Sequence, residues 1–121
     1  MGRILFVDDD LDALETYQKA VALANHHADV ASNAASALEL IRNQDFDLIF
    51  VDINLPDVSG LELIHQLAED RLVDQSPIMV LSALPEEKLI SQVLDAGAKR
   101  FLSKPVSLSD LLEVIALYDR D

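Results

Sequence analysis

The stretch DLIFVDINLPDVSG, residues Asp47–Gly60, decides the fold of this chain. Its first part, Leu48–Val51, is a continuous run of apolar strand formers that is too short for a helix, which is typical of a strand buried on both faces of a parallel sheet. The run ends at the carboxylate of Asp52, and ligands of open α/β sheets bind at the carboxyl ends of the strands. Pro56 and Gly60 indicate a loop, so Asp52 is predicted to lie at the ligand-binding edge of a sheet.

The rest of the chain alternates strands and helices in the same way. Strands are expected at Ile4–Val7, Ala28–Ala31, Leu48–Val51, Ile78–Leu81 and Lys99–Leu102. The first helix is expected at about Leu11–Asn25, the second after a cap at Ser32 or Asn33, and the fourth from Pro85 to just before Gly97. The third and fifth helices are expected to begin at capping-box pairs, Ser59 with Glu62 and Ser107 with Asp110. This alternation implies right-handed βαβ units, and therefore a parallel sheet with helices on both faces. We predict a flavodoxin-like, doubly wound (βα)5 fold with strand order 2-1-3-4-5, in which the weak strand Ala28–Ala31 lies at an edge.

The composition is that of a globular protein with one domain. The chain has 121 residues, of which 50% are hydrophobic and 26% are charged, and the absence of cysteine excludes disulfides and thiolate-based metal sites. Its apolar runs are shorter than the roughly 20 residues of a membrane helix, and the chain begins almost directly with a strand rather than a signal peptide. We expect one domain over residues 1–121, located in the cytoplasm, with no effector domain visible.

The net charge argues against one class of partner. With 22 acidic and 9 basic residues the chain carries a formal charge of -13, which repels the phosphate backbone of a nucleic acid. Direct binding of nucleic acid by this domain is therefore not expected, and neither is binding to a membrane. Most of the charged side chains are expected to be solvated, as are His26, His27 and His65.

Polar side chains follow four of the five predicted strands. They are Asp8 and Asp9 after the first strand, Asp52 after the third, Ser82 after the fourth and Lys104 after the fifth. In the order 2-1-3-4-5 the strand that ends at Asp52 lies between the first and the fourth, so these side chains meet at one edge. Lys104 starts roughly 10 Å from Asp52, because adjacent strands lie about 4.8 Å apart, and its long side chain can close most of that gap.

This group of side chains has the chemistry of phosphoryl transfer. Carboxylates that lie close together require either a raised pKa or a cation, and a site with oxygen ligands alone favours a hard ion such as Mg²⁺. Asp52 would be the nucleophile that accepts the phosphoryl group. The metal and Lys104 would neutralise the charge of the transferring group, and Ser82 would donate a hydrogen bond to one of its oxygens.

At these residues the chain resembles the receiver domains of two-component response regulators over essentially its whole length. The resemblance rests on the pair Asp8-Asp9, on Asp52 with Pro56 and Gly60 downstream, on Ser82-Ala83, on Phe101 and on Lys104-Pro105. It implies that Asp52 is the phosphoacceptor and that Asp9, Asp52 and the backbone carbonyl of Asn54 bind Mg²⁺, with Asp8 assisting through water. It also implies a sensor histidine kinase or a histidine phosphotransfer protein as the donor.

The resemblance further implies a switch rather than an enzyme. The domain would be a stoichiometric phosphoacceptor that assists its own phosphorylation and dephosphorylation. Ser82 would move toward the phosphoryl group and Phe101 would turn inward, which changes the face formed by the helix after Pro85, the strand Lys99–Leu102 and the helix after Ser107. The Lys104-Pro105 bond is expected to be cis.

Other interpretations remain open on the sequence alone. Asp8, Asp9 and Asp10 could simply cap a helix. A phosphatase resembling the haloacid dehalogenases also uses a strand-end Asp, but it carries a second acid at the position occupied here by Asn54. A degenerate receiver that acts only as a binding module is a third reading. The last helix carries Val114 and Leu117 beyond one buried stripe, which indicates either a surface for a homodimer or an effector, or simple core packing. The cognate kinase, the pathway and the output cannot be read from the sequence.

Overall fold

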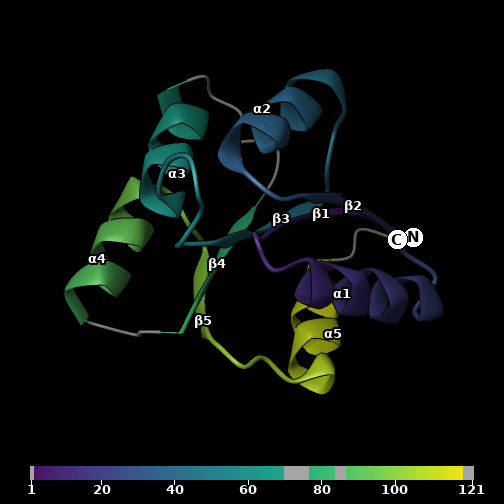
Figure 1. The fold of residues 1–121 in the computed structure, drawn as a ribbon. Helices are drawn as coiled ribbons and strands as arrows, with labels where there is room; N and C mark the ends of the chain where they lie inside the picture. Colours follow the sequence, from purple (N-terminus) through teal and green to yellow (C-terminus); the bar gives the residue numbers. More distant parts are fainter. Residues whose placement is uncertain (1, 70–76, 84–86, 119–121) are drawn as a thin grey trace.

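The computed structural model describes residues 2–69, 77–83 and 87–118 of the chain. Five strands alternate with five helices in these residues (Figure 1). The strands are β1 (Arg3–Val7), β2 (His27–Ala31), β3 (Leu48–Asp52), β4 (Ile78–Ser82) and β5 (Arg100–Ser103). The helices are α1 (Leu11–Leu23), α2 (Ala34–Asn43), α3 (Gly60–Glu69), α4 (Glu87–Ala96) and α5 (Leu108–Leu117).

The strands form one parallel sheet in the order β2-β1-β3-β4-β5, which confirms the predicted topology. Each residue of β3 and of β4 is buried, as expected for central strands covered on both faces. β2 lies at an edge, and only Ala31 of its five residues is buried. The central position of β3 places Asp52 between the ends of β1 and β4.

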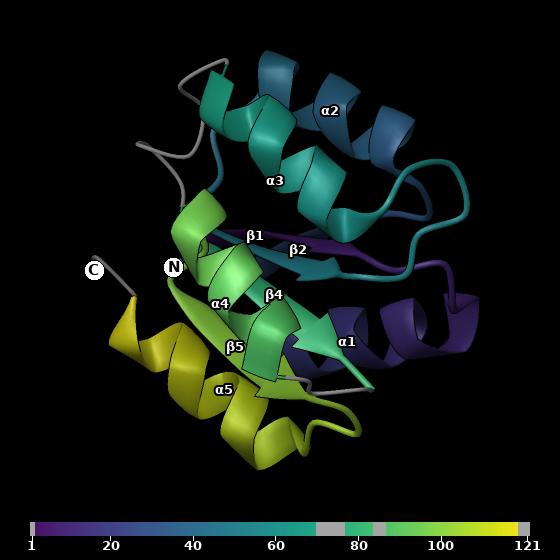
Figure 2. The same cartoon turned by 90° about the vertical axis from the view of Figure 1, so that its left-hand side faces the viewer.

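Helices cover both faces of the sheet (Figure 2). The buried side chains between the helices and the sheet form two separate cores. The first core lies under α2, α3 and α4 and includes Leu5, Val51 and Leu63. The second lies under α1 and α5 and contains Phe6, whose ring stacks with those of Tyr17 and Phe50, with ring centroids 5.0 Å apart in both pairs. Because alternate residues of a central strand enter different cores, β3 and β4 are apolar up to the polar residues at their ends.

The helix starts follow the predicted caps where the structure describes them. Asn33, rather than Ser32, caps α2, and its side chain accepts the N–H of Ser36 at 2.8 Å. Ser59 and Ser107 each accept the N–H three residues later at 3.1 Å, at the starts of α3 and α5. The predicted start of the fourth helix at Pro85 lies outside the described residues.

Several details differ from the predictions; the fifth strand, for example, is Arg100–Ser103 rather than Lys99–Leu102. Helix α1 ends at Leu23 rather than at Asn25, because Asn25 takes a left-handed backbone conformation with φ of 66° that cannot continue a right-handed helix. His26 is not simply solvated: it is half-buried and its Nδ1 accepts the backbone N–H of Gly2 at 2.9 Å.

The first and last described residues lie together at the amino edge of the sheet, opposite to Asp52. Gly2 and Tyr118 line the same small cavity, together with Ile4, Leu48 and Ile115. No helix in the described residues combines the length and the apolar character needed to cross a bilayer.

Candidate functional site

The sheet brings together the polar side chains predicted to meet at its carboxyl edge. Asp8 and Asp9 directly follow β1, Asp52 and Ser82 are the last residues of β3 and β4, and Lys104 directly follows β5. Asp8, Asp52 and Ser82 are the buried polar residues of the described chain, with relative exposures of 1%, 6% and 0%. Buried polar groups at one edge of an otherwise apolar sheet indicate a functional site rather than structural packing.

Lys104 connects two of the carboxylates. Its Nζ donates to Oδ2 of Asp8 and to Oδ2 of Asp52, both at 2.7 Å. The second oxygen of each carboxylate accepts a backbone N–H at 3.0 Å, from Asp10 in the case of Asp8 and from Asn54 in the case of Asp52. Both carboxylates are therefore fixed on both of their oxygens, which preorganises the site.

The electrostatics follow from this burial and pairing. Burial raises the pKa of Asp8 above its usual value, and this effect exceeds the opposing hydrogen bond from Lys104. Burial alone would lower the pKa of Lys104, but the hydrogen bonds to Asp52 and Asp8 outweigh it and hold that pKa well above its usual value. Lys104 therefore stays charged at neutral pH, and it is one cation facing several carboxylates.

The donor set fits a hard divalent cation. Asp8, Asp9 and Asp52 each offer one carboxylate oxygen, and these three oxygens lie within 4.8 Å of one another. The single positive charge of Lys104, which contacts Asp8 and Asp52, cannot balance three carboxylates. Oxygen ligands and excess negative charge are what Mg²⁺ and Ca²⁺ require.

The three acidic residues after β1, Asp8, Asp9 and Asp10, have different roles. Asp10 is the N-cap of α1, and its Oδ1 accepts the N–H groups of Asp12 and Ala13 at 3.1 and 3.2 Å. The capping interpretation therefore holds for Asp10. It does not account for Asp8, which is buried against Lys104, or for Asp9, which is exposed but belongs to the carboxylate cluster.

The two residues expected to switch lie on neighbouring strands. Ser82 is fully buried at the end of β4, and its carbonyl accepts the N–H of Lys104 at 2.8 Å. Phe101 lies in β5 beside Val80, where it is half-buried and packs against the core under α2, α3 and α4. The Lys104-Pro105 peptide bond is cis, as predicted.

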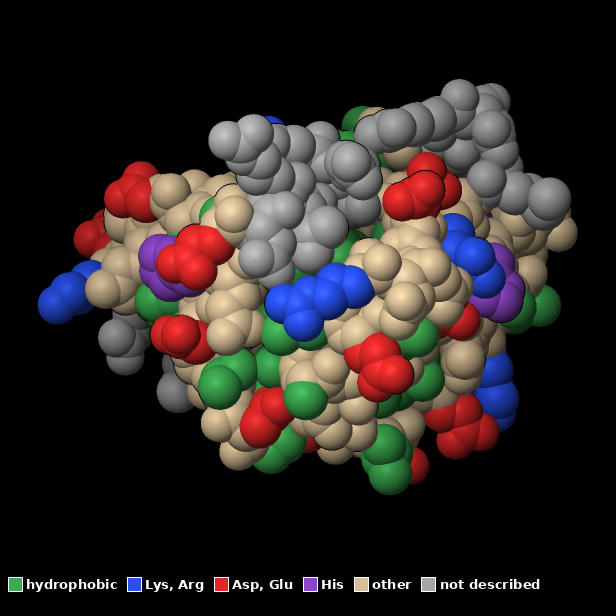
Figure 3. Space-filling model, turned by 90° about the horizontal axis from the view of Figure 1, so that it is seen from above, with side chains coloured by type: hydrophobic (Ala, Val, Ile, Leu, Met, Phe, Trp, Pro, Cys, Tyr) green, Lys and Arg blue, Asp and Glu red, His purple; other side chains and the backbone are tan. Residues whose placement is uncertain are grey.

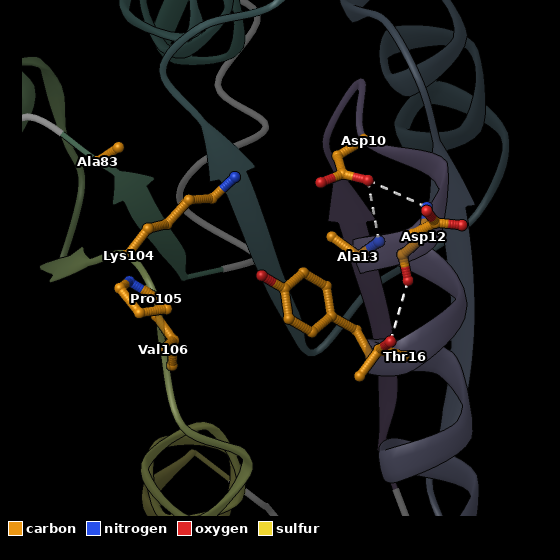
Figure 4. Close-up of a pocket in the computed structure, with 9 residues that line it drawn as sticks. Asp10, Asp12, Ala13, Thr16, Ala83, Lys104, Pro105 and Val106 are labelled. Atoms are coloured by element: carbon orange, nitrogen blue, oxygen red, sulfur yellow. Dashed lines mark hydrogen bonds between the residues drawn. The ribbon is translucent and has the colours of Figure 1, made fainter.

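A groove opens beside Lys104 (Figure 4). Its volume is about 440 Å³, and it lies between the first turns of α1 and the segment that follows β5. One wall is formed by Asp10, Asp12, Ala13, Thr16 and Tyr17, and the other by Ala83, Lys104, Pro105 and Val106. The groove gives a path from solvent toward the strand ends, so the lysine that contacts Asp52 is accessible from one side.

Asp57 is a feature of the site region that we did not predict from sequence. It lies in the loop between β3 and α3, and its two carboxylate oxygens accept the N–H groups of Ala34 and Ala35 at 3.0 Å each. These donors open helix α2, more than 20 positions earlier in the chain. No local pattern reveals such a contact, because an Asp after Pro reads equally well as a turn residue.

The chain matches known proteins over nearly its full length. The family model described as "Response regulator receiver domain" matches residues 4–116. The response regulator MprA of Mycobacterium sp. (strain KMS) is 36% identical over 110 residues, which cover 91% of this chain and 47% of that protein. The chain therefore spans about half the length of this relative.

Solved structures agree with the sequence comparison. A CheY-like response regulator receiver domain protein from Methanospirillum hungatei JF-1 is 31% identical, with a TM-score of 0.90 over 97% of this chain and 92% of that one. A response regulator from Burkholderia pseudomallei, solved with a phosphorylated aspartic acid, calcium ion and citrate, is 26% identical, with a TM-score of 0.86 over 99% of this chain and 68% of that one.

Proposed function

The chain belongs to the response regulator receiver domain family, and on that premise we propose that Asp52 accepts a phosphoryl group from a phosphohistidine donor. Receiver domains are the phosphorylation-dependent switches of two-component signalling. The observation that carries the assignment to Asp52 is its hydrogen bond with Lys104: Asp52 is a buried carboxylate at the centre of the sheet edge, 2.7 Å from an amine that is charged at neutral pH. The phosphorylated aspartic acid of the Burkholderia pseudomallei regulator supports the same chemistry.

The proposed step is an in-line transfer. One oxygen of the Asp52 carboxylate forms a bond to phosphorus while the phosphorus–nitrogen bond of the donor breaks, and the electron pair of that bond stays on the imidazole. Lys104 would pass from the carboxylates to a phosphoryl oxygen, and the hydroxyl of Ser82 would donate to another. Both side chains then stabilise charge that develops during the transfer.

Asp9, Asp52 and the backbone carbonyl of Asn54 would hold Mg²⁺, with Asp8 acting through a bound water. When bound, the ion supplies positive charge next to the transferring phosphoryl group. The support for this ligand set is the cluster of three carboxylates within 4.8 Å and the position of Asn54, whose N–H is fixed on Asp52 at 3.0 Å.

The donor would be a sensor histidine kinase or a histidine phosphotransfer protein, and it would approach through the groove beside Lys104. A cytoplasmic location follows from this donor, because kinases make phosphohistidine from ATP. The domain would act stoichiometrically rather than as an enzyme with turnover.

The structural change caused by phosphorylation would reach a partner or effector through the face formed by α4, β5 and α5. Inward rotation of Phe101 after movement of Ser82 is the expected link between the phosphoryl group and this face. Leu94, Leu108 and Leu117 are large apolar residues of α4 and α5 that are 42%, 44% and 61% exposed, which suits a homodimer or effector surface. Direct nucleic-acid binding is not part of the proposal: the formal charge is -13, and acidic side chains are interspersed with basic ones on the face seen in Figure 3.

The experiment that tests this assignment is an intact-mass measurement after incubation with Mg²⁺ and a small acyl phosphate. The wild type should gain one phosphoryl group, and Asp52→Asn or a chelator should abolish the gain. A gain in Asp52→Asn would overturn the assignment of the phosphoacceptor. No gain in wild type with either an acyl phosphate or a phosphohistidine donor would favour a binding module, and turnover of a phosphomonoester would favour the haloacid-dehalogenase alternative.

A further inference from the structure

The loop that carries Asn54 is held at its base by the packing of a glycine. The N–H of Gly60 donates to the carbonyl of Ile53 at 2.8 Å, which closes the loop on itself. A Cβ at Gly60 would lie 2.7 Å from both the carbonyl oxygen of Asp52 and the Cα of Ile53. Only glycine allows this close approach, so the base of the loop is fixed next to the phosphoacceptor.

The far side of the loop is held by Asp57. Its Oδ1 accepts the N–H of Ala34 and its Oδ2 accepts the N–H of Ala35, both at 3.0 Å. Both donors belong to the first turn of α2, where backbone N–H groups have no partner within the helix. Asp57 is thus a helix cap supplied from another loop, and it ties that loop to α2.

Helix α2 needs this outside cap because its own cap is incomplete. The side chain of Asn33 accepts the N–H of Ser36, and it leaves the N–H groups of Ala34 and Ala35 to Asp57. The first turn of α2 also contains no acidic residue, so the negative charge that a helix N-terminus favours comes from Asp57. In line with this, the hydrogen bonds from Ala34 and Ala35 hold the pKa of Asp57 below its usual value.

Between these two attachments the loop has few other constraints. Asn54, Pro56 and Ser59 are exposed, and only Leu55 and Val58 pack against the core. Without Asp57, the segment between Asn54 and Gly60 would depend on these two partly buried side chains and on two local hydrogen bonds, from the Asn54 N–H to Asp52 and from the Glu62 N–H to Ser59. Its backbone would then be free to sample more conformations.

The loop between β3 and α3, residues 53–59, is called the phosphoacceptor loop below. We propose that Asp57 is a positioning residue that fixes the backbone of this loop on helix α2, so that the carbonyl of Asn54 is held in place for the metal ion. The inference rests on the proposed function, because it gives Asp57 a role toward the Mg²⁺ site described above. It adds a residue that touches neither the metal nor the phosphoryl group. Asp57 acts indirectly, through its hydrogen bonds to the first turn of helix α2.

The test compares Asp57→Ala with a matched control, Asn33→Ala. Both variants remove a cap from the first turn of α2, but only Asp57→Ala releases the loop. Hydrogen exchange of the Asn54 and Gly60 amides, measured by NMR in chelator, should become faster in Asp57→Ala and stay at the wild-type rate in Asn33→Ala. Titration with Mg²⁺ should show about tenfold weaker binding for Asp57→Ala only, the lower end of the effect of removing a residue that orients a metal ligand.

Asp57→Asn adds a graded variant, since its amide oxygen can accept one of the two N–H groups and its Mg²⁺ affinity should lie between those of wild type and Asp57→Ala. Unchanged loop exchange in Asp57→Ala would overturn the proposal, as would equal losses of Mg²⁺ affinity in Asp57→Ala and Asn33→Ala. A wild type that binds no Mg²⁺ would instead overturn the metal site of the proposed function, and the exchange rates in chelator would still show whether Asp57 anchors the loop.

Discussion

At the scale of single residues, the charged form of Asp8 is disfavoured by burial when no metal is bound. Burial raises the pKa of Asp8, so the folded protein holds this proton more tightly than the unfolded chain does. A raised carboxyl pKa contributes stability below its unfolded value, near 3.8, and that contribution is lost as the pH rises through the folded value. Ionised Asp8 therefore lowers the stability of the metal-free domain at neutral pH.

Asp8→Asn is expected to stabilise the metal-free domain at pH 7, because an amide carries no charge that burial disfavours. The gain should shrink as the pH is lowered, because wild-type Asp8 then takes up its proton. Urea unfolding in chelator at several pH values measures both effects. A loss of stability at pH 7 would mean that the hydrogen bond from Lys104 outweighs the burial of Asp8.

The residues of the site were predictable to different degrees. Asp8, Asp52, Ser82 and Lys104 could be placed from sequence, because parallel strands deliver their last residues to one edge whatever the details of packing. The contacts of Lys104 with both Asp8 and Asp52 could not be predicted, since the conformation of a flexible side chain depends on its surroundings in the folded protein. The contact of Asp57 with α2 was also beyond prediction, because it depends on how two loops approach each other in space.

At the scale of elements, the start of helix α3 and the end of helix α4 use glycine for different reasons. Gly60 has no room for a side chain, because a Cβ would meet the backbone of Asp52 and Ile53 at 2.7 Å. Gly97 has open space around it but takes φ of +126°, which residues with a side chain rarely adopt. Steric contact is the constraint at Gly60, and backbone conformation is the constraint at Gly97.

Gly60→Ala is expected to destabilise the domain by about 3 kcal/mol, because backbone atoms rather than a flexible side chain must move. Gly97→Ala should cost about 1 to 2 kcal/mol through backbone strain alone. The free energies of unfolding in urea give the two values, and Mg²⁺ titration should show weaker binding for Gly60→Ala only. Equal Mg²⁺ affinities in the two variants would contradict the link between Gly60 and the phosphoacceptor loop.

The elements themselves were largely predictable, and their ends less so. Capping patterns at Ser59 and Ser107 identified two helix starts, because the cap is a local interaction. The end of α1 was predicted two residues too late, since nothing in the local sequence shows that Asn25 leaves the helical conformation. Asn33 and Ser32 are both good caps, so the choice between them required the structure.

At the scale of the whole molecule, metal binding and folding should be linked. The carboxylates of the cluster come from the ends of β1 and β3, which lie together only in the folded sheet. An ion that binds the folded state alone raises the free energy of unfolding by about 2.7 kcal/mol at a concentration of 100 times its dissociation constant.

Thermal unfolding in increasing Mg²⁺ is therefore expected to show a rising midpoint for the wild type. Asp52→Asn should show a smaller rise, because one ligand has lost its charge. Matched salt without a divalent ion controls for screening. A midpoint that does not respond to Mg²⁺ would contradict a metal site at this edge, whatever the outcome of phosphorylation.

The closeness of Gly2 and Tyr118 has a consequence for protein engineering and for the evolution of longer chains. These first and last described residues lie at the edge opposite to Asp52, a strand length of roughly 16 Å away. A segment fused next to either residue, or a host protein that carries the domain as an insertion, would be attached on the side opposite to the site. Such an attachment would leave the groove beside Lys104 uncovered. The same layout means that tethering a sensor or reporter module at the termini should not hinder phosphorylation.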